Sequence, residues 1–247
     1  YALTITPDLK AATFTGSETI DVVVGAPTKT ITLNAAEIKF DSVKAEVLAA
    51  GTPMEMAGTA SLDVAKEQAT LTFAQELPAG RVRLAIAYKG ILNDKLRGFY
   101  LSKSATSRYG VTQFEATDAR RAFPCFDEPA LKATFDVTLV VNEGDMAISN
   151  MEVMKDTAGP VAGKHTVVFA TTPKMSTYLV AWVAGEFACS SGKEEGVKIR
   201  VCATPDKAKL TKFAVGAAKH FLHYYDGYFG IKYPLKKLDL VAVPDFE

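Results

Sequence analysis

The sequence lacks any excess of charge and several well-known site motifs. Its 28 basic and 28 acidic residues cancel, so the molecule as a whole offers little electrostatic steering toward nucleic acid or anionic lipid. Phosphate loops of the G-x-x-x-x-G-K kind, dinucleotide glycine runs and G-x-S-x-G elbows are all missing. We therefore expect no nucleic-acid partner and none of the reactions that these three motifs carry.

Long apolar runs are also missing. A membrane helix needs about 18 or more consecutive apolar residues, whereas the densest run covers only residues 178–184. No basic segment followed by an apolar one opens the chain, although a first residue of Tyr leaves open that a preceding piece was removed. We expect no membrane span in this segment.

Cysteine is scarce and widely spaced. Cys125, Cys189 and Cys202 form no Cys-x-x-Cys pair, which predicts neither a disulfide framework nor a thiolate zinc site. Reduced thiols in a cytosolic setting fit this pattern best. We interpret Cys125 as a small buried hydrophobic residue rather than a nucleophile.

What dominates the first three quarters of the chain is a period-two alternation of apolar and polar residues. Clear examples run from Val82 to Tyr88 and from Phe135 to Val141, as expected of half-buried strands. Further strands are predicted over residues 18–24, 29–33, 37–40, 69–73 and 166–170, with turn-forming residues at 142–145. Many short strands predict a β-sandwich.

The pattern changes near residue 190. The continuously apolar run 178–184 predicts a strand covered on both faces, whereas the polar run 190–196 predicts an exposed link or a hairpin turn before a strand at 197–203. We therefore predict two domains, residues 1–190 and residues 191–247.

A helix is predicted next, because Thr204 suits the N-cap, Pro205 the first helical position, and Gly227 or Gly230 the end. Its apolar residues recur at helical spacing, and we interpret this stripe as core. The stripe comprises Leu210, Phe213, Ala214, Ala217, Phe221, Tyr224 and Tyr228. Residues 238–243 then return to a strand, so this part is mixed α and β.

Two histidines on that helix need a separate interpretation. His220 and His223 lie three residues apart, whereas the zinc-peptidase pattern H-E-x-x-H spaces its histidines by four and follows the first with glutamate. We expect this helix face to contact neighbouring segments and predict no metal ligand in the chain.

The densest cluster of polar and charged residues is T-Q-F-E-A-T-D-A-R-R-A-F-P-C-F-D-E-P, at residues 112–129. It resembles zinc aminopeptidases of the aminopeptidase N superfamily (gluzincins), most of all the puromycin-sensitive branch. Supporting stretches are L-N-D-K-L-R-G-F-Y at 92–100, P-K-M-S-T-Y-L-V-A at 173–181 and the run from Y-P-L at 233 to D-F-E at 247. The resemblance covers nearly the whole chain.

This resemblance implies a mainly β chain, with an N-terminal β-sandwich or saddle-like domain followed by the start of an α/β thermolysin-like catalytic domain. It implies a zinc metalloaminopeptidase, a cytoplasmic hydrolase that removes single residues from peptide N-termini. Glu115 would pair with the substrate α-ammonium group, and Gln113 would line the pocket for the first side chain. Without the resemblance, an internal salt bridge from Glu115 to Arg120 or Arg121 is the favoured interpretation.

The rest of the cluster is interpreted as scaffold. Two bases and two acids in a long loop, Arg120, Arg121, Asp127 and Glu128, suit a device that orients the loop carrying the proposed binding residues.

The family's G-A-M-E-N segment and H-E-x-x-H helix are absent, and the sequence stops just before their expected places. We therefore expect a fragment with no catalytic residue and no bound zinc, whose partners are peptides with a free N-terminus and the remaining catalytic and C-terminal domains. The alternative is a non-catalytic β-sandwich binding or interaction module derived from this family.

Overall fold

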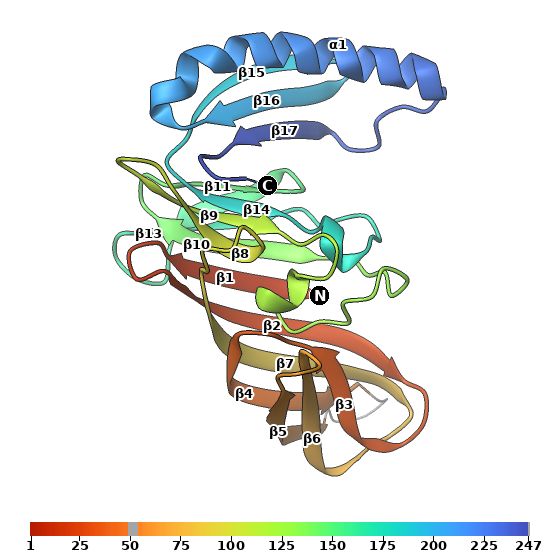
Figure 1. The fold of residues 1–247 in the computed structure, drawn as a ribbon. Helices are drawn as coiled ribbons and strands as arrows, with labels where there is room; N and C mark the ends of the chain where they lie inside the picture. The colour runs from red at the N-terminus through yellow and green to blue at the C-terminus, as the bar shows by residue number, and fades with distance from the viewer. Residues whose placement is uncertain (49–53, 247) are drawn as a thin grey trace.

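The computed structural model describes residues 1–48 and 54–246, in which the strands form three stacked sheets with the long helix α1 on the outside (Figure 1). The largest sheet has ten strands, in the spatial order β12 (Val153–Ala158), β13 (Lys164–Phe169), β10 (Asp136–Asn142), β1 (Ala2–Asp8), β2 (Thr13–Val24), β7 (Gly80–Ile91), β4 (Ile38–Val47), β5 (Met54–Asp63), β6 (Gln68–Leu77) and β3 (Thr28–Asn34). The chain is mainly β, as the sequence predicts.

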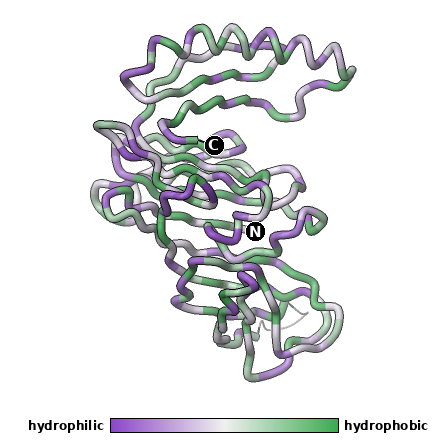
Figure 2. The backbone as a smooth tube through the Cα atoms, in the orientation of Figure 1, coloured by the Kyte–Doolittle hydropathy of each residue, from purple (hydrophilic) through white to green (hydrophobic). Residues whose placement is uncertain are grey.

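Period-two alternation builds this large sheet. Along β7, Val82, Leu84, Ile86 and Tyr88 are buried while the residues between them are more exposed, and hydrophobic and hydrophilic residues alternate along the strands (Figure 2). The five shorter predicted strands coincide with parts of β2, β3, β4, β6 and β13, to within one residue at either end, which confirms them. Among the described strands of this sheet one pair is parallel: β1 lies beside β10, with Ala2 opposite Asp136.

The middle layer is a four-stranded sheet, in the order β11 (Met146–Ser149), β14 (Trp182–Gly185), β9 (Arg108–Gln113) and β8 (Gly98–Lys103). Phe99 and Leu101 of β8 belong to the core shared with the ten-stranded sheet, whereas Tyr100 belongs to a second core on the opposite face. Because both faces are covered, nearly every residue of β8 is buried.

One strand prediction needs correction. Of the run 178–184, only the end is strand: η2 (Thr177–Leu179) is a 3-10 turn, and β14 begins at Trp182. The side chain of Asn150 explains the break, because it donates to the Leu179 carbonyl (2.8 Å) and accepts from the Ala181 amide (2.8 Å). These backbone groups are therefore satisfied without a strand partner.

The third layer is a three-stranded sheet of β15 (Ala188–Glu194), β16 (Val197–Ala203) and β17 (Lys237–Ala242). The 3-10 helix η3 (Pro205–Leu210) leads into α1 (Thr211–Phe229), which ends at Gly230 in the left-handed conformation (φ 65°), as predicted. In the described residues, no helix combines the length and apolarity that crossing a bilayer requires.

The predicted core stripe of α1 is wrong in this chain. Leu210, Phe213, Phe221, Tyr224 and Tyr228 are all exposed, and Phe213 retains 85% of its accessible surface. The helix instead buries the opposite stripe, which contains Thr211, Val215, Ala218, Leu222 and Asp226. Helical spacing alone does not decide which of two apolar faces meets the sheet.

The structure also differs from the prediction of free thiols at two of the three cysteines. Cys189 and Cys202 form a disulfide and are directly opposite each other on β15 and β16. The turn between these strands is Glu195–Gly196, both at positive φ, and this two-residue turn fixes the register that makes the cysteines partners. The predicted link at 190–196 is thus the end of β15 and its hairpin turn. Cys125 is free and fully buried, as predicted, and burial raises the pKa of its thiol.

One buried carboxyl group of the large sheet has no polar partner in the part of the chain that the structure describes. Glu18 of β2 is 3% exposed, and among the described residues neither its oxygens nor the buried hydroxyl of Tyr88 has a hydrogen-bond partner. Burial raises the pKa of Glu18 well above its ordinary value of 4.5. The folded protein therefore retains a proton that the unfolded chain releases near pH 4.5.

We predict that the free energy of unfolding falls as pH rises above 4.5 toward the raised pKa of Glu18, because only the unfolded state gains from ionisation there. Glu18→Gln should remove this dependence, so it should exceed the parent in stability at pH 7 and match it near pH 4. Urea unfolding from pH 4 to pH 8 measures the difference. Glu143→Gln, at an exposed turn between strands of two different sheets, is the control. Equal stability of Glu18→Gln and parent at pH 7 would contradict the interpretation.

Candidate functional site

The two predicted binding residues lie at the end of β9. Gln113 is the last residue of that strand, is partly exposed, and pairs with Gly98 of β8. Glu115 follows two residues later and is exposed. Thr112 and Phe114, which precede Gln113 and Glu115, are buried, so both predicted binding residues are turned toward the outside.

Buried neighbours hold this segment in place. The Thr112 hydroxyl donates to the Trp182 carbonyl (3.0 Å) and accepts from the Trp182 amide (2.9 Å), which ties β9 to β14. The Phe114 ring is 2% exposed and packs edge-on against Trp182 and Phe123, with ring centroids 5.4 and 5.9 Å apart. Anchoring residues 112 and 114 inward directs residues 113 and 115 outward.

A tight turn presents the Glu115 carboxylate. The Asp118 amide donates to the Phe114 carbonyl (2.9 Å), which leaves Glu115, Ala116 and Thr117 exposed between them. The Glu115–Ala116 peptide bond is cis.

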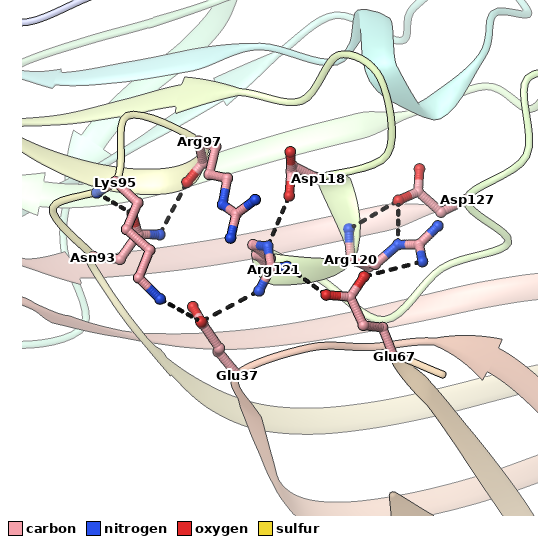
Figure 3. Close-up of polar contacts among 9 residues, drawn as sticks. All are labelled: Glu37, Glu67, Asn93, Lys95, Arg97, Asp118, Arg120, Arg121 and Asp127. Atoms are coloured by element: carbon pink, nitrogen blue, oxygen red, sulfur yellow. Dashed lines mark hydrogen bonds and ion pairs between the residues drawn. The ribbon is translucent and has the colours of Figure 1, made fainter. Parts of the chain in front are cut away.

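Behind this turn, two buried arginines anchor a network of ion pairs (Figure 3). Arg121 pairs with Asp118 (Nε to Oδ1, 2.7 Å), with Glu37 (Nη1 to Oε1, 3.3 Å) and with Glu67 through Nη2. Arg120 pairs with the deeply buried Asp127 (Nε to Oδ2, 3.0 Å) and with Glu67 (Nη1 to Oε2, 3.3 Å). The network therefore includes both of these neighbouring guanidinium groups.

The acids of this network come from separate parts of the chain. Glu37 precedes β4 and Glu67 precedes β6, so both belong to connections of the ten-stranded sheet, whereas Asp118 and Asp127 flank the arginines in the loop. The arginines therefore tie the loop that carries Glu115 to the large sheet. Sequence reasoning missed Glu37 and Glu67, because nothing in their local pattern places them near residue 120.

A glycine allows this close approach. Gly98 of β8 adopts φ +68°, and a Cβ atom built there would lie 2.7 Å from the Cβ of Arg121. Because Gly98 is also the strand partner of Gln113, the arginine packs directly behind the predicted binding residues.

The scaffold prediction is confirmed for Arg120, Arg121 and Asp127. Glu128 is exposed, and the described residues give it no ion pair. The alternative of a salt bridge from Glu115 to either arginine is not found: both arginines pair with other acids, and Glu115 has no ion pair within residues 1–48 and 54–246.

The histidines lie elsewhere. His223 on α1 contacts Glu195 at the β15–β16 turn (Nδ1 to Oε1, 3.1 Å), which fits the expected contact with a neighbouring segment. The side-chain ligand atoms of His223, Glu194 and Glu195 lie within 4.8 Å of one another, close enough to share a metal ion. Lys219 already pairs with Glu194, however, and Lys232 with Glu195.

Comparison with known proteins identifies the family. The sequence model of the Peptidase M1 N-terminal domain matches residues 1–179. The chain belongs to the peptidase M1 family. Aminopeptidase M1-C of Oryza sativa subsp. japonica is 45% identical, Aminopeptidase M1 of Arabidopsis thaliana 39% and the puromycin-sensitive aminopeptidase of Caenorhabditis elegans 38%. Each alignment covers this whole peptidase M1 chain but only 26–28% of the relative.

We predict that Asp127→Ala destabilises this peptidase M1 chain by about 3–5 kcal/mol, because it leaves the Arg120 guanidinium buried and partly unpaired. Asp21→Ala is the matched control, since it breaks an exposed ion pair with Arg83 that is worth about 0–1 kcal/mol. Denaturant unfolding measures both. Equal costs for the two substitutions would show that the buried network does not anchor the loop.

Proposed function

We propose that this chain is the N-terminal part of a zinc metalloaminopeptidase that removes single residues from peptide N-termini, and that it supplies recognition of the substrate amine. The relatives it matches are named aminopeptidases, and it spans about a quarter of their length. The observation that carries the proposal is the exposed carboxylate of Glu115, unpaired within the described residues and held on a turn between buried anchors.

The chemistry of Glu115 suits a free N-terminus. A carboxylate enclosed by a bound peptide pairs well with an α-ammonium group but stays unpaired against an internal amide, which carries no charge. Holding the first residue at a fixed position would also help to orient the scissile bond. Gln113, also turned toward the outside, would contribute an amide to the wall of the pocket for the first side chain.

Zinc, in our proposal, is held by the part of the enzyme that lies outside this chain. In such enzymes the metal polarises the scissile carbonyl and activates water. No H-E-x-x-H pattern occurs in this sequence, and the cluster at His223 does not fit the role because two lysines occupy its carboxylates. We therefore propose that this chain alone hydrolyses nothing and binds no catalytic zinc.

We further propose that residues 191–247 begin the catalytic domain and that the remaining catalytic domain covers α1. The outer face of α1 supports this, because Phe221 and Phe229 are more than half exposed beside a largely apolar cavity of about 610 Å³. Leu240 of β17 lies on the other wall of that cavity. Exposed apolar surface of this extent is typical of an interface.

We predict that Glu115→Ala in the full-length enzyme raises KM and lowers kcat/KM about 30-fold or more for peptides with a free N-terminus, because truncating one partner of a desolvated charge pair costs about 2 kcal/mol or more. Steady-state kinetics on aminoacyl fluorogenic substrates measures the loss. Glu128→Ala, an exposed acid of the same loop, should retain parental kinetics.

Parental kinetics for Glu115→Ala would remove Glu115 from the site. A full-length protein without peptidase activity, yet with retained peptide binding, would favour the non-catalytic module instead.

We propose a cytoplasmic location, which the resemblance to the puromycin-sensitive branch supports. Disulfides persist mainly in oxidising compartments, so the Cys189–Cys202 pair makes the location testable. We predict that all three cysteines of this segment are labelled when its own cells are lysed and the protein is unfolded in the presence of an alkylating reagent. The purified protein, after exposure to air, should instead form the disulfide. Labelling of Cys125 alone, after unfolding at lysis, would contradict a cytoplasmic location.

A further inference from the structure

The three-stranded sheet carries a row of lysines on the face turned away from α1. Lys193 of β15 lies opposite Lys198 of β16, and Lys198 lies opposite Lys237 of β17. Val197 and Ile199, the sequence neighbours of Lys198, belong to the small core that includes α1 residues, so Lys198 points to the other side. Like charges directly opposite each other destabilise a sheet.

Internal carboxylates neutralise only part of this row. Lys237 bonds to the Ser149 carbonyl (Nζ to O, 2.6 Å) and pairs with Asp239, and Asp239 also accepts both hydrogen bonds of Arg200 (2.8 and 3.1 Å). Lys193 and Lys198, by contrast, have no ion pair among the described residues. The single carboxylate of Asp239 is thus already shared by two cations.

The row borders a concave site rather than a flat surface. A cavity of about 530 Å³ is lined by the three lysines of the row and by Arg200, and Lys236 adds a further ammonium group. Lys236 has no ion pair in residues 1–48 and 54–246 either. The volume lies within the range of about 300–1,000 Å³ typical of small-molecule sites.

The acidic side chains of the cavity wall are Glu152 and Asp239, and Asp239 is occupied as described. Five basic groups therefore face two acidic ones, in a chain whose formal charge is zero. Charge concentrated in a cleft attracts counter-ions more strongly than the same charge spread over the surface.

We propose that this cavity binds a small soluble anion that carries two or more phosphate groups. Lysine ammonium groups act as mobile point charges toward phosphate, and several of them on different strands suit a ligand whose charge is spread over several oxygens. Glu152 precedes β12 of the ten-stranded sheet, while the lysines belong to the three-stranded sheet and its connection. The Glu152 carboxylate would repel the anion, so the contacts that bind it come from the three-stranded sheet and its connection.

Pyrophosphate and tripolyphosphate are the probes, titrated by calorimetry into the full-length protein at constant ionic strength. We expect saturable binding of one anion per chain, stronger for tripolyphosphate, and a rise in Tm that sulfate does not reproduce. Lys198→Gln and Lys236→Gln should each weaken binding about 10-fold, the effect of one charge-assisted hydrogen bond. Lys29→Gln, which removes the same charge from an exposed position on β3, should leave binding unchanged.

Lys198→Gln has a second expected effect. Without ligand and at low salt, it should raise Tm, because it relieves the repulsion from Lys193 and Lys237, and added salt should reduce this gain.

The proposal is overturned if Lys198→Gln binds tripolyphosphate as Lys29→Gln does, or if sulfate competes equally. It is also overturned if the protein sediments with vesicles containing phosphoinositides but does not bind the soluble anions, because the ligand would then be a lipid surface.

Discussion

Two adjacent buried guanidinium groups constrain the architecture around the candidate site. Arg120 and Arg121 cannot lose their charge, so folding must bring carboxylates to them. Those carboxylates come from the loop itself and from two connections of the ten-stranded sheet, at Glu37 and Glu67. The ion pairs of the two arginines therefore hold the loop against the ten-stranded sheet. They also hold in place the turn that presents Glu115.

The middle sheet connects the candidate site to the rest of the chain, because it packs against both of the other sheets. Its strands β8 and β9 pack against the large core with one face and toward the three-stranded sheet with the other. The Asp245 carbonyl accepts a hydrogen bond from Tyr100 of β8 (2.7 Å), and the Asp245 amide donates to Ser102 (3.1 Å). The segment after β17 thus lies against the strand next to the one that carries Gln113.

Local features of the fold could be predicted from the sequence, because period-two alternation encodes which strand face is buried. The scaffold role of Arg120 and Arg121 could be predicted as well, since clustered charges in a loop need partners. Contacts between distant segments could not: Glu37 and Glu67 give no local signal, and α1 offers two apolar faces. The Cys189–Cys202 pair is intermediate, because centring a hairpin on Glu195–Gly196 would have made the two residues partners.

The parallel pairing of β1 with β10 has a consequence for synthesis on the ribosome. Ala2 pairs with Asp136, so one edge of β1 stays unsatisfied until the 134 residues that follow Ala2 have also been synthesised. At a synthesis rate of about 5–20 residues per second, that delay is on the order of ten seconds. An open strand edge exposed for that long is a binding target for chaperones that act on nascent polypeptides.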